Sequence, residues 1–151
     1  MIKMIFVYGS LMTDFWNYNK FLKDHVIHTQ KATITGTLYH IENKGYPAYI
    51  KEGSTSIHGE ILSIDNYQNL IGALDCLEGY HKPIDANNEY NRRPVPVTLL
   101  SSGHTLELDV YVYNHNSPRN QHDHLSLIPH GNWRKYMVAQ ASQKQVLTSS
   151  L

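Results

Sequence analysis

The sequence predicts an α+β fold in which a small, mixed, barrel-like curled sheet carries a few packed helices. Strand patterns outnumber helical ones, and a single segment has a strong helical period. Gly59 falls inside one expected strand, and Pro94 and Pro96 fall inside another. Glycine and proline within strands are typical of bulges and edges, which bend a sheet. Because the strands do not alternate with helices, the pattern is not that of a doubly wound parallel sheet.

Five segments have strand patterns. Residues 2–7 form an almost continuous apolar run, which is typical of a strand buried on both faces. Residues 106–113 instead place apolar side chains on one face and polar side chains on the other. The expected strands cover residues 2–7, 31–41, 54–64, 90–100 and 106–113.

Three segments are expected to be helical. The middle one is the clearest, because Leu70, Ile71, Leu74 and Leu77 recur at helical spacing. The expected helices cover residues 14–24, a segment capped at Asp65 or Asn66 that ends at Glu78, and residues 133–139. The polar segments 79–89 and 114–131 are expected to be loops, and loops as long as the second are often functional or mobile.

Length and composition indicate one domain over residues 1–140, followed by a flexible tail over residues 141–151. The formal net charge is zero, and no block of like charges predicts binding to nucleic acid or to a membrane. We see no signal peptide and no membrane-spanning run. A single cysteine rules out an internal disulfide framework and fits the reducing cytosol, so a cytoplasmic location is expected.

The first candidate binding element is the loop formed by Tyr8, Gly9, Ser10 and Leu11, directly after the first strand. Glycine lacks a Cβ atom, so it can adopt a backbone conformation closed to other residues and lets a ligand approach the main chain. Successive backbone N–H groups in such a turn can form a concave anion-binding nest. From these residues alone, an ordinary turn between a strand and a loop is the preferred interpretation.

The second candidate is Glu78, four residues after Leu74 and seven after Ile71, which places it on the apolar face of its helix. Gly79 is expected to end that helix. Burial and the negative end of the helix dipole both disfavour a carboxylate there, so both raise its pKa towards the range useful for proton transfer. On periodicity alone, a last-turn glutamate that frays into solvent is an equal alternative.

Other chemistries have weaker support. The segment His122-Asp123-His124 lacks the spacing and partners of a metal site, so a solvated loop is the preferred interpretation. Cys76 lies on the helix side opposite Glu78 and has no base beside it in the sequence, which favours a buried, inert thiol. Tyrosines such as Tyr46 and Tyr111 are candidate cleft residues, although packing explains them as well.

The order of short motifs along the chain resembles the gamma-glutamylcyclotransferase-like family, which includes gamma-glutamylamine cyclotransferases and the butirosin-biosynthesis cyclotransferase. The resemblance covers roughly Ile2 to Met137 and is carried by the joint order of the motifs. These motifs are Val7-Tyr8-Gly9-Ser10-Leu11, Gly36-Thr37-Leu38-Tyr39, Gly45-Tyr46-Pro47-Ala48, Gly59-Glu60-Ile61-Leu62, Leu74-Asp75-Cys76-Leu77-Glu78-Gly79, Tyr90-Asn91-Arg92 and Val110-Tyr111-Val112-Tyr113.

The resemblance implies a barrel-like sheet with helices outside and a cleft in which the Tyr8–Leu11 loop binds the amino-acid end of a small γ-glutamyl substrate. It implies that Glu78 is the general acid and base for cyclisation to 5-oxoproline with release of an amine, without a metal or other cofactor. The amine and the oligomeric state stay open. The alternative is a diverged, non-catalytic binder of a small amino-acid-like ligand, because a fold does not determine a function.

Overall fold

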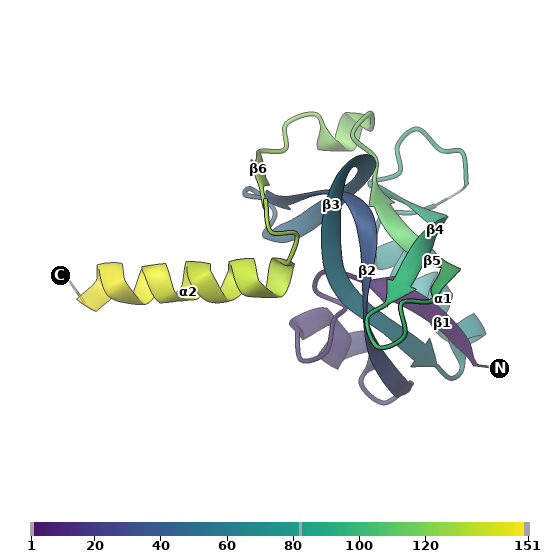
Figure 1. Ribbon diagram of the computed structural model, residues 1–151. Helices are drawn as coiled ribbons and strands as arrows, with labels where there is room; N and C mark the ends of the chain where they lie inside the picture. The colour runs from purple at the N-terminus through teal and green to yellow at the C-terminus, as the bar shows by residue number, and fades with distance from the viewer. Residues whose placement is uncertain (1, 82, 150–151) are drawn as a thin grey trace.

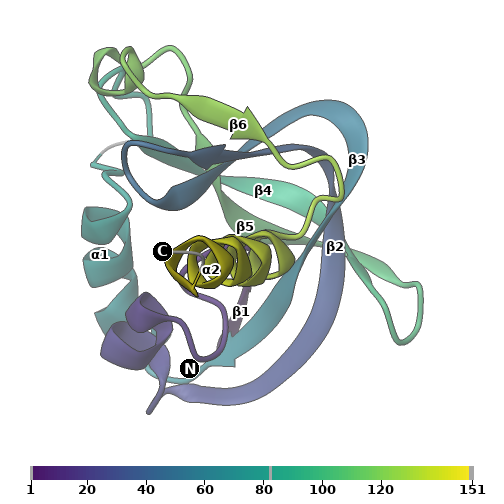
Figure 2. The ribbon, with the colours of Figure 1, turned by 90° about the vertical axis from the view of Figure 1, so that its left-hand side faces the viewer.

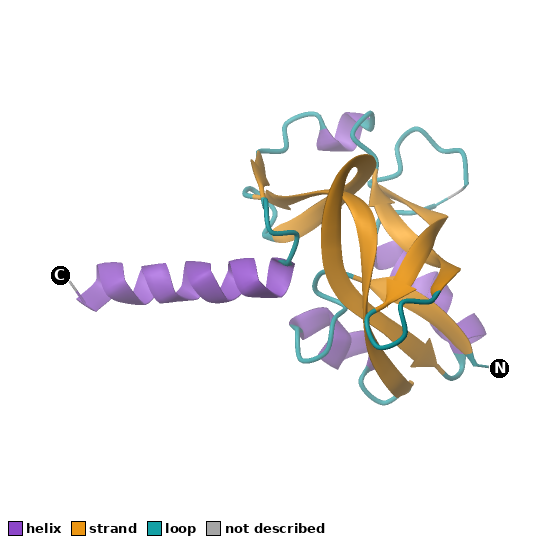
Figure 3. Cartoon of the chain, viewed as in Figure 1, coloured by secondary structure: helices purple, strands orange, loops and turns teal. Residues whose placement is uncertain are grey.

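The structure is a computed structural model that describes residues 2–81 and 83–149 (Figure 1). Six strands and two main helices form the molecule, with one short π-helix and one short 3-10 helix in the connections (Figure 3). The strands are β1 (Lys3–Val7), β2 (Val26–Ile41), β3 (Tyr46–Ile64), β4 (Tyr90–Leu99), β5 (Thr105–Tyr113) and β6 (Leu125–Leu127). The helices are η1 (Tyr18–Leu22), α1 (Tyr67–Leu77), η2 (Pro118–Asn120) and α2 (Trp133–Ser149).

The strands form one sheet in the order β3-β1-β5-β4-β2-β6, and β2 also pairs with β3. That additional pairing closes β1 to β5 into a barrel, with β6 added beside β2 (Figure 2). β1 runs parallel to β5, at Ile5 opposite Asp109, and the other pairs are antiparallel. The mixed, barrel-like α+β fold predicted from the sequence is therefore confirmed.

The strand irregularities fall where the barrel bends. A Cβ atom at Gly59 would collide with the Val7 carbonyl and the Phe6 ring, so this glycine permits β3 to lie close against β1. β2 pairs with β4 only at Thr98 and Leu99, near the end of β4. The earlier prolines of β4 therefore need no backbone donor on that side, as expected for an edge.

The hydrophobic core lies inside the barrel and extends under the helices. Leu38, Ile57 and Leu62 are fully buried in it. α1 lies along one side of the barrel, as Figure 2 shows, and buries Tyr67 and Leu74 against it. α2 projects away from the barrel, but its first residue, Trp133, is fully buried (Figure 1).

The C-terminal part of the chain differs from the prediction in two places. α2 continues beyond the expected end at Ala139 through the segment 141–149, and the flexibility expected of this segment stays a prediction. Its alanine, glutamine, lysine and leucine residues favour helix, and neither glycine nor proline interrupts it. Residues 150–151 lie outside the described part of the chain. The expected loop 114–131 also contains η2 and the short strand β6.

Other boundaries differ from the prediction. β3 starts at Tyr46, eight residues earlier than the expected strand 54–64, because the Gly45-Tyr46-Pro47-Ala48 segment pairs with the end of β2. The expected helix 14–24 is reduced to η1. Within the described residues, no helix has both the length and the apolar character needed to cross a membrane.

Candidate active site

The Tyr8–Leu11 loop follows β1 and turns back through a hydrogen bond from the Met12 N–H to the Gly9 carbonyl at 2.9 Å. Among the residues that the structure describes, the N–H groups of Gly9, Ser10 and Leu11 find no acceptor. Buried backbone donors are almost always paired, so three free N–H groups in a row are available to a ligand.

Gly9 is required by space and not by a left-handed backbone. The glycines with positive φ in the described residues do not include Gly9. A Cβ atom there would instead lie 2.7 Å from Pro47 Cγ and 2.9 Å from Pro47 Cδ, in the adjoining part of β3. The side chain of Ser10 points to a different partner, because its Oγ accepts a hydrogen bond from Asn17 Nδ2 at 2.8 Å.

Glu78 is fixed at the end of α1 by a Schellman motif. Gly79 has a φ of +66°, and its N–H donates to the Cys76 carbonyl at 3.2 Å. The Tyr80 N–H donates to the Asp75 carbonyl at 2.8 Å. These two bonds are the hydrogen bonds of this capping motif and confirm Gly79 as the residue that ends the helix. They leave Glu78 at the C-cap, on the barrel side of the helix.

The loop and the helix end meet in one pocket of about 560 Å³, part of which is open solvent. All the residues predicted for the site line it: Tyr8, Gly9, Ser10, Leu11 and Glu78. The barrel strands also line the pocket, through Tyr46 and Pro47 of β3, Tyr90 of β4 and Tyr111 of β5. Glu89, the residue just before β4, lines it as well.

Four tyrosines surround the Glu78 carboxylate without bonding to it. Each hydroxyl donates to another acceptor at 2.6 Å: Tyr8 to the Tyr111 carbonyl, Tyr46 to Glu89, Tyr90 to the Pro47 carbonyl and Tyr111 to Asp75. Within the described residues, no group hydrogen-bonds the Glu78 carboxylate. The pocket thus places an unpartnered carboxyl group among aromatic rings whose polar atoms are already engaged.

This environment changes the acidity of Glu78. Burial, followed by the negative charges of Glu89 and Asp75, raises the pKa of Glu78 to about 8. The same burial, with the nearby carboxylates, raises the pKa of the Tyr46 and Tyr111 hydroxyls above their usual range, so these groups stay protonated. Glu78 is therefore the pocket group suited to exchanging protons near neutral pH.

Asp75, one turn before Glu78, is held very differently. The Arg92 guanidinium of β4 binds both of its carboxylate oxygens, at 2.9 Å through Nε and 3.1 Å through Nη2. Tyr111 donates a third hydrogen bond to it, and Asp109 accepts one from Arg92 at 3.0 Å. This bidentate pair connects α1 to β4 and β5, and so fixes the helix end that carries Glu78.

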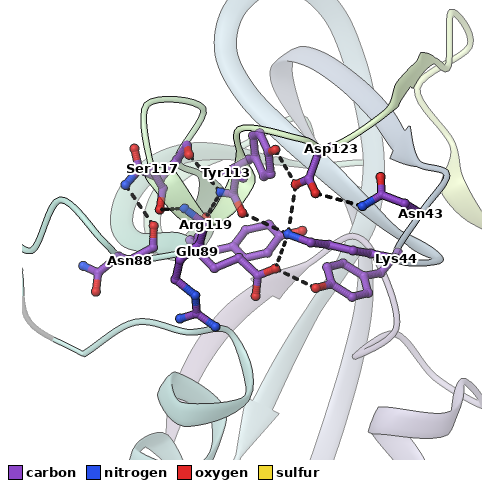
Figure 4. Close-up of polar contacts among 12 residues, drawn as sticks. Asn43, Lys44, Asn88, Glu89, Tyr113, Ser117, Arg119 and Asp123 are labelled. Atoms are coloured by element: carbon purple, nitrogen blue, oxygen red, sulfur yellow. Dashed lines mark hydrogen bonds and ion pairs between the residues drawn. The ribbon is translucent and has the colours of Figure 1, made fainter.

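Glu89 is the site residue that the sequence did not reveal. It is 8% exposed, and its Oε2 atom accepts hydrogen bonds from Lys44 Nζ at 2.8 Å and from the Tyr46 hydroxyl at 2.6 Å. Lys44 also binds Asp123 Oδ2 and Asn120 Oδ1, each at 2.9 Å (Figure 4). Glu89 stands at a boundary between loop and strand and pairs across 45 positions of sequence, so no local period identifies it.

Two of the weaker candidates are resolved by the structure. Cys76 is exposed, so the expectation of a buried thiol was wrong, and it does not line the pocket. It points outward because α1 packs its opposite face on the barrel.

Asp123 is bound by Lys44, Tyr113 and Asn43 (Figure 4). Among the described residues, no three His, Cys, Asp or Glu side chains are placed to hold a metal ion.

Known structures share this architecture. The chain matches an aig2-like protein from Mus musculus with a TM-score of 0.62 and 20% identity, over 87% of each chain. It matches YkqA from Bacillus subtilis with a TM-score of 0.64 and 22% identity, over 94% of this chain and 43% of that one. The fold is therefore that of aig2-like proteins.

Sequence comparison places the chain within a family. It is 31% identical over 150 residues to the gamma-L-glutamyl-butirosin B gamma-glutamyl cyclotransferase of Niallia circulans, covering 97% of this chain and 87% of that protein. Residues 5–135 match the family described as gamma-glutamyl cyclotransferase, AIG2-like. The chain belongs to this family.

Proposed function

We propose that the protein is an enzyme that cyclises a γ-glutamyl amine or amide to 5-oxoproline and releases the free amine. The observation that carries this proposal is the Glu78 carboxyl group, which has no hydrogen-bond partner among the described residues and a pKa raised to about 8. It lines the same pocket as the free N–H groups of the Tyr8–Leu11 loop. Family membership supports the same reaction class.

The pocket supplies two complementary functions. The free N–H groups of Gly9, Ser10 and Leu11 bind the α-carboxylate of the substrate, since oriented backbone N–H groups favour an anion. Glu78 then stands beside the α-nitrogen and the γ-carbonyl of the same molecule. Because both reacting groups belong to one substrate, holding it in a folded conformation supplies much of the rate acceleration.

The reaction balances with one proton-transferring group. The α-nitrogen attacks the γ-carbonyl carbon and forms the lactam bond, and the bond from that carbon to the leaving nitrogen breaks. Two protons leave the α-ammonium and two reach the leaving nitrogen, so the amine departs as an ammonium ion. Glu78 accepts protons from the first nitrogen and returns them to the second, which requires a pKa close to the working pH. No water, metal or nucleotide takes part.

A panel of γ-glutamyl compounds tests the proposal. The protein is incubated with γ-glutamyl methylamide, a γ-glutamyl amine with a cationic amine half and a γ-glutamyl dipeptide, and 5-oxoproline is detected by mass spectrometry. We expect 5-oxoproline and the matching free amine in equal amounts from at least one compound. Binding without any 5-oxoproline would favour the alternative of a diverged, non-catalytic binder.

Cys76→Ser is the matched control on the same helix. The thiol lies outside the pocket, so this variant should form 5-oxoproline at the rate of the wild-type protein. A large loss in Cys76→Ser with an unchanged melting temperature would indicate covalent chemistry at the thiol and would contradict the assignment of the reaction to Glu78.

A further inference from the structure

Glu89 has one carboxylate oxygen in use and one that is free. Lys44 and Tyr46 both bind Oε2, while Oε1 has no hydrogen-bond partner among the described residues. No fully buried side-chain oxygen of the described residues is left without a partner, so Oε1 is not fully buried. Glu89 lines the same pocket as Glu78, and we infer that Oε1 faces it.

The position of Oε1 is rigidly set. Lys44 ties Glu89 to Asp123 and Asn120 of the segment between β5 and β6, and Tyr113 donates to Asp123 Oδ2 at 2.6 Å (Figure 4). The backbone adds to this, because the Glu89 N–H donates to the Gly79 carbonyl at 3.0 Å. A side chain held at so many points presents Oε1 in one direction.

Glycine at position 79 leaves room for the Glu89 side chain. A Cβ atom on Gly79 would lie 2.8 Å from Glu89 Cβ, 3.2 Å from Arg119 Nη1 and 3.4 Å from Glu89 Oε1. The Glu89 side chain therefore lies against the residue that follows Glu78. A larger residue at position 79 would displace Glu89, so this glycine serves the geometry of the pocket as well as the end of α1.

The surroundings of Oε1 leave this acceptor atom available. The two anions Glu89 and Asp123 share the cation Lys44. The exposed Arg119 guanidinium lies near Oε1 beside Gly79 but, among the described residues, forms no ion pair with Glu89. A carboxylate oxygen without a hydrogen-bond partner on a pocket-lining residue is complementary to an ammonium group.

We propose that Glu89 Oε1 binds the α-ammonium group of the γ-glutamyl substrate and so holds the nucleophilic nitrogen beside Glu78. This proposal rests on the proposed function and assigns the two carboxyl groups separate tasks. Glu89 recognises the charge of the ground state, and Glu78 moves the protons. Glu89 is thereby a specificity-determining residue that favours substrates with a free, charged α-amine.

Binding to an inactive background tests this assignment. Affinities are measured by calorimetry for Glu78→Gln and for Glu78→Gln/Glu89→Gln, with γ-glutamyl methylamide and with 5-oxoproline as ligands. The first ligand has the ammonium, whereas the second has an uncharged lactam N–H in its place. We expect Glu89→Gln to weaken binding of γ-glutamyl methylamide about tenfold or more, the effect of losing one charge-assisted hydrogen bond. Binding of 5-oxoproline should change less than about threefold.

Tyr113→Phe in the Glu78→Gln background is the matched control, because it loosens the same network at Asp123 and leaves both Glu89 oxygens in place. It should keep the wild-type preference between the two ligands. Equal weakening of both ligands by Glu89→Gln, or no weakening of either, would overturn the role of Glu89 while leaving the proposed function intact. Failure of the wild-type protein to convert any γ-glutamyl compound would overturn both proposals.

Discussion

Two carboxyl groups, one turn apart at the end of α1, differ in their hydrogen-bond partners. Asp75 accepts hydrogen bonds from Nε and Nη2 of the Arg92 guanidinium and from the Tyr111 hydroxyl. Glu78, at the C-cap, lies among four tyrosines whose hydroxyls are all committed to other acceptors. The barrel therefore neutralises one carboxylate and leaves the other without a partner.

We propose that this difference separates a structural carboxylate, Asp75, from a reactive one, Glu78. A paired carboxylate stabilises the fold through its partners. An unpaired carboxyl group in a pocket opposes folding when it is ionised, and its raised pKa makes it useful for proton transfer. The cost at Glu78 is tolerated because the Asp75 pair fixes the helix end that holds it.

The largest effect should come from removing the reactive group. Glu78→Gln keeps the volume of the side chain but cannot exchange protons, so 5-oxoproline formation should fall on the order of a hundredfold or more. The measurement is the steady-state rate with the best γ-glutamyl substrate, together with circular dichroism to verify the fold. Turnover near that of the wild type in a folded Glu78→Gln protein would show that another group transfers the protons.

A smaller effect is expected in the recognition loop. Gly9→Ala places a methyl group against Pro47, so the loop must move, and we expect about a tenfold loss of affinity for 5-oxoproline. Ser10→Ala removes only the bond from Asn17 and should lose less. Affinity and melting temperature are measured for both variants. If Gly9→Ala only lowers the melting temperature and binds normally, the loop is structural and lies outside the binding site.

The free energy of unfolding should change in opposite directions when Asp75 and Glu78 are each replaced by the neutral amide. Asp75→Asn removes the charge that Arg92 binds and should lower the free energy of unfolding by about 1–2 kcal/mol. Glu78→Gln should raise it at pH 9. The folded pKa of Glu78 lies above the unfolded value, so its contribution is present below the unfolded pKa and is lost as pH rises through about 8.

Each unit of pKa difference is worth about 1.4 kcal/mol, and we expect Glu78→Gln to gain on the order of 2 kcal/mol over wild type at pH 9 and nothing at pH 4. Urea unfolding at the two pH values measures this. A gain of the same size at both values would point to repacking and not to the charge. A loss at pH 9 would mean that the ionised group stabilises the fold.

The sequence was sufficient for the parts of the site that depend on local periodicity. Glu78 follows the apolar face of its helix and Gly79 ends that helix, although spacing alone left a solvent-exposed Glu78 as an equal alternative. The Tyr8–Leu11 loop could be placed because an apolar run ends there. The special backbone conformation expected at Gly9 was wrong, and the close contact of this residue with Pro47 joins residues far apart in the sequence. The approach of a ligand to the Gly9 main chain stays a prediction.

The remaining parts depend on long-range pairing that no local pattern encodes. Glu89 gains its role from Lys44 and from the turn of backbone at Gly79, and the closed barrel creates both contacts. The long segment before β6 looked like a free polar loop, yet Asn120 donates to the Glu89 carbonyl at 3.0 Å and anchors it. Polar residues of this kind acquire a function only through their partners.

The central claim is that Glu78 is an unpartnered carboxyl group with a raised pKa. Carbon-13 NMR of the protein labelled at its glutamate carboxyl carbons tests this directly, with Glu78→Gln used to assign the resonance. The account predicts a titration midpoint near pH 8, as the burial of the group and its neighbours Glu89 and Asp75 require. A midpoint near the ordinary glutamate value of about 4.3 would show a solvated side chain and contradict the account.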